Sequence, residues 1–246
     1  MKVIALIPAR FAATRFPAKL ISDLCGKSVI ARTYLSTVDT GVFDKVMVVT
    51  DHQDIADRIE ELGGEVFFSK ELHESGSDRI AEAATEIEGD IFVNVQGDEP
   101  FQDPKSLSNL VAVFKDPEVR VASLMTPIDH TDSYSNPNVV KVVVDSTSNA
   151  LYFSRSGIPF FRNIQLSKKV YRHIGVYAYR KETLLAFTRM EKTYLEEAEM
   201  LEQLRLLENG IKIKMVQTVH EAIAIDTPED LEKAIAYYKA LSIKGN

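Results

Sequence analysis

Short apolar runs recur through the first half of the chain, separated by longer amphipathic segments. The runs are residues 3–7, 45–50, 65–69, 91–95 and 121–125. Each is rich in β-branched or aromatic residues and is bounded by turn-forming residues, a pattern typical of buried strands. We therefore predict a strand at each run.

The segments between these runs have apolar residues at helical spacing. In one of them Ile55, Ile59 and Leu62 recur at that spacing before Gly63-Gly64. The predicted helices are residues 29–38, 54–62, 80–87 and 107–114. Strands that alternate with helices imply right-handed crossovers and a parallel sheet with helices on both faces. We therefore predict an α/β fold.

The pattern changes between residues 127 and 180, where strands follow one another without long helices. The predicted strands are residues 139–144, 151–154 and 171–179, and aromatic residues are frequent among them. Such a segment cannot lie wholly in the core of the βα sheet, so it forms either an additional lobe or a dimer surface. With no linker or repeat, we expect a single domain, residues 1–246, that includes this lobe.

Helical spacing returns at residues 194–209, and Gly210 ends this predicted helix as its C-cap. A strand is predicted at residues 211–219. Thr227 and Pro228 are typical of a helix start, with threonine as N-cap and proline at the first helical position. Asp226 therefore stands just before a helix, where capping is the alternative to a functional role.

Composition narrows the function classes. The chain has 246 residues and a net charge of −7, which argues against nucleic acid or an anionic membrane surface as partner. One cysteine, Cys25, excludes an internal disulfide and fits a reducing cytoplasm. The sequence has neither a signal-peptide core nor an apolar run of membrane-spanning length. We expect a cytoplasmic protein, complete as given, without membrane insertion.

Polar residues follow the apolar run at 91–95 abruptly, as Gln96-Gly97-Asp98-Glu99-Pro100. Ligands of open α/β sheets bind beyond the carboxyl ends of the strands, which places Gln96, Asp98 and Glu99 at the mouth of a site. Gly97 allows a sharp bend and lets a ligand approach the backbone. A polar turn capped by aspartate is the alternative, and Asp226 as a second carboxylate after an apolar run favours a site.

Three cations and no acid lie in residues 8–19, the loop that follows the first predicted strand. Arg10, Arg15 and Lys19 stand among small residues in a protein that is acidic as a whole. Small residues let the backbone approach a ligand, and the cations can neutralise a polyphosphate. A solvated basic loop is the less favoured alternative, because this loop follows a central strand.

Two phosphate-binding patterns are excluded. Gly26-Lys27-Ser28 resembles the end of a P-loop, but Ile21 occupies the position of the required glycine, and no Gly-x-Gly-x-x-Gly fingerprint is present.

His52 and His73 lack the spacing of metal ligands, and we interpret both as ordinary polar residues.

Several motifs together resemble those of the 3-deoxy-manno-octulosonate (Kdo) cytidylyltransferase family, the CMP-Kdo synthetases. They are Ile7-Pro8-Ala9-Arg10, Thr14-Arg15-Phe16-Pro17-Ala18-Lys19, Ser75-Gly76-Ser77-Asp78-Arg79, Gln96-Gly97-Asp98-Glu99-Pro100 and Ile225-Asp226-Thr227-Pro228-Glu229-Asp230-Leu231. The resemblance extends nearly end to end. Ala13 and Leu20 depart from the family's usual serine and proline, which affects loop geometry and no charged group.

The resemblance implies a Rossmann-like nucleotidyltransferase fold and a Mg²⁺-dependent transfer of CMP from CTP to Kdo, with release of pyrophosphate, for lipopolysaccharide assembly. Phosphoryl transfer requires positioning and charge neutralisation, and Mg²⁺ is commonly held by one or two carboxylates. We expect Asp98 and Asp226 to bind the metal and, with Arg15 and Lys19, to be catalytic. The expected nucleotide-binding residues are Arg10, Ser75, Arg79 and Gln96.

The family likeness also implies a sugar-acid site and a homodimer formed through residues 127–180. The matching positions are Arg155, Arg162, His173, Tyr177, Glu202 and Gln203. Arg155 and Arg162 are the candidates for pairing with the sugar carboxylate, with surface ion pairs as the alternative. Two other functions stay open: a cytidylyltransferase for sialic acid or an amino-Kdo analogue, and a non-catalytic nucleotide-binding regulator of the same fold.

Overall fold

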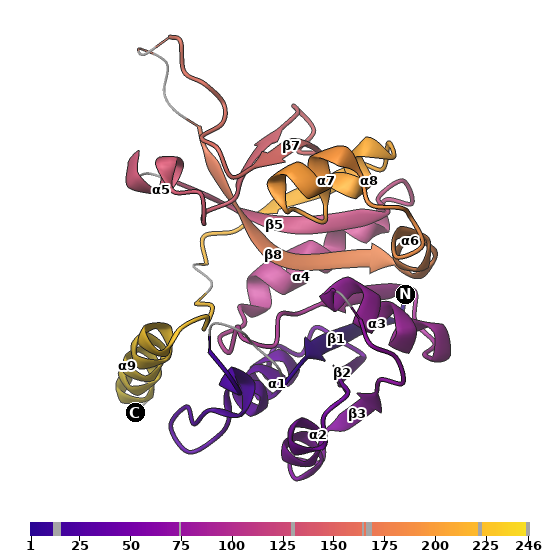
Figure 1. Cartoon of the computed structure of the whole chain (residues 1–246), viewed down its shortest axis with the longest axis vertical. Helices are drawn as coiled ribbons and strands as arrows, with labels where there is room; N and C mark the ends of the chain where they lie inside the picture. Colours follow the sequence, from indigo (N-terminus) through magenta and orange to yellow (C-terminus); the bar gives the residue numbers. More distant parts are fainter. Residues whose placement is uncertain are drawn as a thin grey trace. The chain divides into compact units, whose positions relative to one another are not determined.

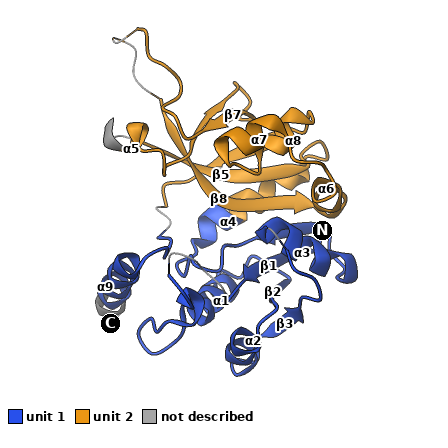
Figure 2. Ribbon diagram, viewed as in Figure 1, with its two compact units in different colours: residues 1–107, 222–246 blue, residues 108–221 orange. Residues whose placement is uncertain are grey.

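The computed structural model (Figure 1) describes residues 1–11, 16–73, 75–128, 131–163, 165, 169–220 and 223–244. The chain divides into two compact units (Figure 2). Unit 1 comprises residues 1–107 and 222–246, and unit 2 comprises residues 108–221. The residues expected to bind the nucleotide therefore belong to unit 1, and those expected to bind the sugar acid belong to unit 2.

Unit 1 is built from alternating strands and helices (Figure 1). Its strands are β1 (Val3–Ala9), β2 (Lys45–Thr50), β3 (Glu65–Phe68) and β4 (Ile91–Asn94). Its helices are α1 (Val29–Asp39), α2 (Gln53–Glu60), α3 (Gly76–Glu86) and α9 (Pro228–Lys244), with a short 3-10 helix η1 (Lys19–Ile21). Every predicted strand and helix of this part is confirmed, with ends that shift by a few residues.

The four strands of unit 1 are parallel and lie in the order β3-β2-β1-β4. Ile4 pairs with Lys45 on one side of β1 and with Phe92 on the other. The side chains of β1 and β4 are buried nearly throughout, as expected for strands covered on both faces. The central strands thus carry the core of unit 1.

The strand order reverses direction once, and this reversal places a binding crevice. The chain steps outward from β1 to β3 and then returns to β4 on the far side of β1. Right-handed crossovers put α1 and α2 on one face and α3 on the other. Between β1 and β4 the two crossovers leave in opposite directions, so their carboxyl ends form the topological switch point where ligands bind in such sheets.

Gly97 lies beside this switch point, and its small size has a packing reason. A Cβ atom at this position would lie 3.0 Å from the Pro8 carbonyl oxygen and 3.3 Å from Ile30 Cδ1. The Thr33 hydroxyl donates to the Gly97 carbonyl at 2.9 Å. The chain itself therefore packs closely on Gly97, which holds the loop after β4 against the end of β1, and the approach of a ligand to this backbone stays a prediction.

Unit 2 combines strands of both directions, and the chain enters it within α4 (Pro104–Ala112), which η2 (Val113–Lys115) follows. Its strands are β5 (Val121–Pro127), β6 (Lys141–Val144), β7 (Ala150–Ser154), β8 (Tyr171–Arg180) and β9 (Ile213–Gln217). Strand β5 pairs with β8 in antiparallel fashion and with β9 in parallel, and β6 pairs antiparallel with β7 and β8. Its helices are α5 (Thr131–Ser135), α6 (Lys181–Phe187), α7 (Tyr194–Glu199) and α8 (Leu204–Glu208).

The prediction of one helix over residues 194–209 is wrong. Met200 has φ 52° and ψ 49°, a left-handed conformation that ends α7, and α8 begins only at Leu204. The Arg155 guanidinium lies at the break and donates to the carbonyl oxygens of Glu199 and Met200. A distant side chain thus replaces the helical hydrogen bonds lost there. Gly210, with φ 73°, follows α8 as predicted.

The α/β prediction is confirmed by the parallel sheet of unit 1 with helices on both faces, and the strand-rich character of the segment after residue 127 is confirmed by β6, β7 and β8. The single domain and the dimer role of that segment stay predictions. Within the described ranges no helix is both long and apolar enough to cross a bilayer.

Candidate active site

A cavity of about 400 Å³ opens in unit 1 at the carboxyl ends of β1 and β4. Its walls come from the ends of these strands, the start of α3, the turn around η1 and the segment before α9. The lining residues are Pro8, Ala9, Arg10, Phe16, Lys19, Leu20, His73, Ser75, Gly76, Arg79, Gln96, Gly97, Asp98 and Asp226. Most of the residues predicted from the sequence to bind a nucleotide therefore share one cavity.

Lys19 joins the two predicted carboxylates. Its Nζ donates to Asp98 Oδ2 and, at 3.0 Å, to Asp226 Oδ1. Its side chain is only 15% exposed. Partial burial lowers the pKa of Lys19, but the charges and hydrogen bonds of Asp98 and Asp226 outweigh burial, and the net pKa is raised. The ammonium group is therefore charged at neutral pH and lies between two acids.

The backbone before Lys19 fixes this arrangement. Ala18 adopts the left-handed conformation, with φ 56° and ψ 24°, and precedes the single turn of η1. A non-glycine residue in this conformation is strained, and such strain is found mostly at binding and catalytic sites. Leu20, where the family usually has proline, is 5% exposed and lines the cavity. This departure leaves Lys19 in contact with both acids.

Two residues that follow Asp226 in the sequence cap α9, and the Asp226 carboxylate contacts Lys19. The cap of α9 is made by Thr227 and Asp230: the Asp230 N–H donates to Thr227 Oγ1 at 3.3 Å, and Asp230 Oδ2 accepts from the Thr227 N–H at 3.2 Å. The Ile225 N–H donates to the Asp98 carbonyl at 3.0 Å, which ties the two acidic segments together. The Asp226 carboxylate can therefore turn toward Lys19.

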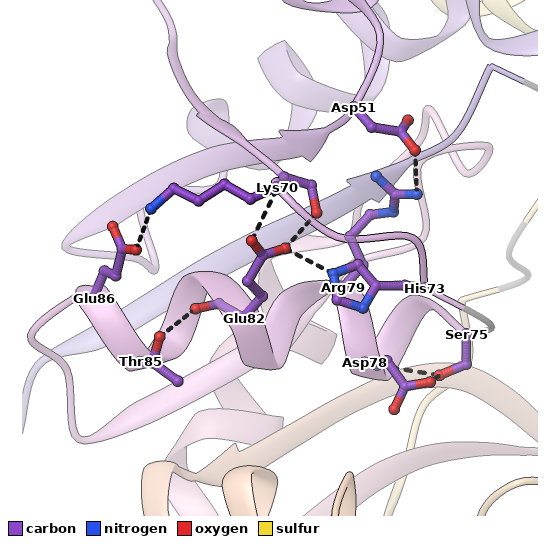
Figure 3. Close-up of polar contacts among 10 residues, drawn as sticks. Asp51, Lys70, His73, Ser75, Asp78, Arg79, Glu82, Thr85 and Glu86 are labelled. Carbon is purple, nitrogen blue, oxygen red and sulfur yellow. Dashed lines mark hydrogen bonds and ion pairs between the residues drawn. The ribbon is translucent and has the colours of Figure 1, made fainter.

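The start of α3 contributes a second wall. Ser75 is its N-cap: Ser75 Oγ accepts from the Asp78 N–H at 3.1 Å and donates to Asp78 Oδ2 at 2.9 Å (Figure 3). The first N–H groups of a helix lack intrahelical partners, and this end of the helix carries partial positive charge. A Cβ at Gly76 would lie 3.3 Å from Pro8 Cγ, so the helix packs closely on the end of β1.

His73, interpreted from the sequence as an ordinary polar residue, lines this cavity. Its side chain is 9% exposed, and Nε2 lies 2.7 Å from Glu82 Oε2 (Figure 3). Glu82 also accepts hydrogen bonds from the Ser69 hydroxyl and, at 2.8 Å, from the Lys70 N–H. The His73 imidazole is thus held in place by Glu82, a residue of α3. Glu82 lies nine residues after His73, and this separation corresponds to no recognisable sequence motif.

Arg79 reaches the cavity from the same helix. The arginine is 5% exposed, and Nη2 donates to Asp51 Oδ2 at 2.9 Å (Figure 3). Arg10 is exposed at the end of β1, and Gln96 lines the cavity after β4. Arg15 lies outside the described residues. Asp51, which follows β2, was missed as a partner because 28 positions separate it from Arg79.

In unit 2, Arg155 is surrounded by backbone carbonyl groups. Its Nε donates to the Glu199 carbonyl at 2.8 Å, Nη1 to Pro137 at 3.1 Å and Nη2 to Met200 at 3.3 Å. The guanidinium group has five N–H donors, so two are left after these bonds. Arg155 therefore joins three loop segments, and its pairing with a sugar carboxylate stays a prediction. Arg162 is exposed on the segment that follows.

Two residues outside the predicted set hold Arg155. The Lys141 ammonium is fully buried and donates to the carbonyls of Arg155, Asn136 (2.9 Å) and Val139 (2.6 Å). Glu199 accepts from the Ser154 hydroxyl at 2.6 Å and from the Arg155 N–H at 2.9 Å. In the sequence, the one sign of this network is a lysine, Lys141, within a run of β-branched residues.

The remaining candidates of the sugar group lie on β8 and between α7 and α8. His173 Nε2 lies 3.0 Å from Ser123 Oγ, and burial together with the nearby Arg172 lowers the pKa of His173 to about 3. The Tyr177 hydroxyl is buried without a well-aligned hydrogen-bond partner among the described residues, and burial raises its pKa. Gln203 is buried, whereas Glu202 is partly exposed. Unit 2 therefore holds a neutral imidazole and a phenol with an open donor.

Known proteins are similar to this chain over most of its length. Residues 4–213 match the sequence family described as cytidylyltransferase. Two curated relatives are named 3-deoxy-manno-octulosonate cytidylyltransferase. One from Flavobacterium johnsoniae is 54% identical, with 96% of this chain and 98% of that protein covered. One from Christiangramia forsetii is 52% identical, with 95% of each chain covered.

Solved structures of other proteins are also similar to this chain. A CMP:2-keto-3-deoxy-manno-octonic acid synthetase complexed with CTP is 36% identical and superposes with a TM-score of 0.93, with 98% of this chain and 99% of that chain covered. A 4-diphosphocytidyl-2C-methyl-D-erythritol synthase from Anaerococcus prevotii has a TM-score of 0.63 at 15% identity, with 97% of this chain and 98% of that chain covered, and shares the fold alone.

Proposed function

The chain belongs to the 3-deoxy-manno-octulosonate cytidylyltransferase family, and on that premise we propose that it transfers CMP from CTP to the anomeric hydroxyl of Kdo and releases pyrophosphate. The hydroxyl oxygen attacks the α-phosphorus. The new P–O bond joins CMP to the sugar, and the bond to the bridging oxygen of the β-phosphate breaks. The hydroxyl proton is released to water, and the leaving pyrophosphate takes up the electron pair of the broken P–O bond.

One observation carries this proposal: a single ammonium group, Lys19, held between Asp98 and Asp226 in a cavity at the switch point of the sheet. Transfer of a nucleotidyl group requires in-line positioning and neutralisation of charge, with little covalent help from the protein. Lys19 supplies a fixed positive charge where negative charge develops on the leaving pyrophosphate. The acids keep that charge in place before substrate arrives.

The donor set of this cavity fits Mg²⁺. Asp98 and Asp226 both contact the same ammonium group, so their oxygen atoms converge on one point that already favours a cation. Among the described residues no cluster of three or more His, Cys, Asp or Glu side chains forms a metal site, and two carboxylates suit an ion that keeps water and phosphate oxygens as further ligands. When bound, Mg²⁺ would neutralise charge on the phosphates. Asp98 and Asp226 would hold it.

The α3 wall would bind the nucleoside part of CTP. Ser75 and Gly76 lie at the start of α3. Glu82 holds His73 in place, and Asp51 holds Arg79. Gln96 lines the cavity just after β4. Because polar side chains held in fixed positions need little reordering on binding, this wall selects a ligand more effectively than mobile side chains. Arg10 extends the positive charge toward the triphosphate.

In unit 2, Arg155, Arg162, His173, Tyr177, Glu202 and Gln203 would bind the sugar acid. Arg155 retains two N–H donors for a carboxylate, whose geometry matches the guanidinium fork. The Tyr177 hydroxyl has no well-aligned partner among the residues that the structure describes and would find one in a sugar hydroxyl. We further propose a cytoplasmic homodimer that supplies CMP-Kdo for lipopolysaccharide assembly.

A pyrophosphate-release assay tests this function. The protein is incubated with CTP, Mg²⁺ and, one at a time, Kdo, an amino-Kdo analogue, sialic acid and Kdo reduced at its carboxylate. We expect release with Kdo and very little with the reduced analogue, because sites that hydrogen-bond a polar group reject ligands without it. Faster release with sialic acid or the amino sugar would assign another acceptor. No release with any sugar would favour a nucleotide-binding regulator.

A further inference from the structure

The Arg79 guanidinium group is only partly paired. Nη2 donates to Asp51 Oδ2 at 2.9 Å, whereas Nη1 is buried and has no hydrogen-bond partner among the described residues. The side chain is 7% exposed and lines the cavity of unit 1. Buried polar groups in folded proteins are nearly always hydrogen-bonded, and an unpaired one is unfavourable. An open donor on a side chain that lines a cavity indicates a ligand with an acceptor atom.

Asp51 determines where this donor points. It follows β2 directly, at the same carboxyl edge of the sheet as the cavity. Burial raises the pKa of Asp51, but the hydrogen bond and charge of Arg79 outweigh burial and leave the pKa below its ordinary value. The carboxylate is thus ionised at neutral pH. Figure 3 shows it meeting the end of the Arg79 side chain that rises from α3.

The charge of the pair selects the kind of acceptor. Arg79 and Asp51 together carry no net charge, and the carboxylate would repel a phosphate brought to the same guanidinium group. Arg10, which is exposed at the end of β1 and lines the same cavity, carries a charge that suits phosphates better. A neutral acceptor therefore fits Nη1 best. In a nucleoside triphosphate such acceptors are the carbonyl oxygens and ring nitrogens of the base.

We propose that Asp51 is a positioning residue that holds Arg79 so that Nη1 donates to the pyrimidine base and distinguishes cytosine from uracil. The inference rests on the proposed function, since it assigns part of the CTP site. Cytosine presents two adjacent acceptors, O2 and N3, to which two N–H groups of the Arg79 guanidinium can donate. Uracil carries a hydrogen on N3, which would face the arginine donors and leave one of them unpaired.

The discrimination expected from such a contact is substantial. A bidentate contact between a side chain and a base typically favours the correct base by about ten- to a hundredfold. Asp51→Asn keeps the shape of the side chain but weakens its hold on Arg79. The variant should lose about tenfold of the preference for CTP over UTP, toward the low end of that range. Asp51→Asn also changes the net charge of the Arg79–Asp51 pair, which affects the binding of both nucleotides. The informative quantity is therefore the ratio of the affinity for CTP to the affinity for UTP.

The test measures binding of CTP and UTP by calorimetry with Mg²⁺ and without sugar, in wild type, Asp51→Asn, Arg79→Lys and the double variant. Asp57→Asn is the matched control, because Asp57 is an exposed acid on α2 that accepts from Gln53 Nε2 at 2.6 Å. Melting temperatures are recorded for all variants. Steady-state kinetics with Kdo follow, and the KM for Kdo should stay unchanged.

We expect the CTP preference to fall in Asp51→Asn and in Arg79→Lys, and the double variant to resemble Arg79→Lys, since Asp51 acts through Arg79. An unchanged ratio in Asp51→Asn overturns the proposal, as does a loss in the double variant equal to the sum of the two single losses. Equal weakening of CTP and UTP with a lower melting temperature would mean a structural role only. Should Asp51→Asn fail to fold, Asp51→Glu keeps the charge, displaces the guanidinium and is held to the same ratio.

The binding readout separates this inference from the proposed function. A wild type that binds CTP well but transfers nothing to Kdo would refute the transferase, while the CTP to UTP ratio would still test Asp51. A wild type that transfers to Kdo but binds CTP and UTP equally would retain the function and overturn the inference.

Discussion

Replacing Asp98 by asparagine is the most informative single perturbation of the proposed site. Asparagine has the same shape as aspartate but no charge. The substitution removes one of two acids from Lys19 and leaves Asp226 at 3.0 Å. Asp98 is the more buried acid, with 23% of its side chain exposed against 43% for Asp226. Its charge is therefore the less screened of the two, and its loss should affect catalysis more.

The expected effects on catalysis and on stability differ in size. Loss of one preorganised electrostatic contact in the transition state lowers kcat by about 10²- to 10³-fold. A hydrogen bond to a charged group contributes about 1.5–3 kcal/mol to stability, and Lys19 keeps a partner in Asp226. The loss of stability should lie at or below the low end of that range. The fold is retained, because domains are typically stable by about 5–15 kcal/mol.

The assay combines pyrophosphate release with thermal melting. Asp90→Asn is the matched control: Asp90 precedes the same strand, β4, at its other end and accepts from the Lys2 N–H at 2.6 Å. This control should keep full activity. Near wild-type turnover of Asp98→Asn with Mg²⁺ would refute the role of Asp98, and a large drop in melting temperature would refute the argument that its effect is electrostatic.

Four further predictions concern Lys19, His173, Arg155 and the oligomeric state. Lys19→Ala should lower kcat more than it raises the KM for CTP, because the leaving pyrophosphate carries more charge in the transition state; an effect on KM alone would make Lys19 a binding residue. His173 is neutral down to about pH 3 in the fold, whereas unfolded histidine takes up a proton near pH 6.5. The free energy of unfolding should therefore fall as the pH drops from about 6.5 toward 3, and a His173→Gln variant in urea titrations should show a shallower fall; an equal slope would contradict the low pKa. Arg155→Lys should raise the KM for Kdo and leave CTP binding unchanged, and kinetics that show equal loss of both would place Arg155 elsewhere. Sedimentation at micromolar concentration should give a homodimer, and a stable monomer would refute the dimer surface at residues 127–180.

The sequence allowed the order of elements in unit 1 to be predicted because each strand and helix there is encoded locally. β-branched runs are bounded by turn residues, and the helices between them have regular apolar spacing. Asp98 and Asp226 were recognised because each follows an apolar run. Their meeting at Lys19 follows from the parallel sheet, in which carboxyl ends share one edge.

What the sequence could not supply depends on contacts between distant residues. The break at Met200 was missed because apolar spacing continues across it, and the carbonyls freed there bond to Arg155, 45 positions away. Asp51 and Arg79 come from β2 and α3 and meet only in the folded chain. No local pattern records such pairs, so charge partners of buried arginines require a structure.

Phosphorus NMR of the complete reaction would observe the transfer of CMP from CTP to Kdo itself. Protein, CTP, Kdo and Mg²⁺ are followed together, with omission of Kdo as the control. We predict that the three CTP resonances are replaced by one phosphodiester signal and pyrophosphate, in equal molar amounts, only when Kdo is present. Consumption of CTP without Kdo, or formation of orthophosphate or free CMP in place of the phosphodiester, would contradict the transfer of CMP to the sugar.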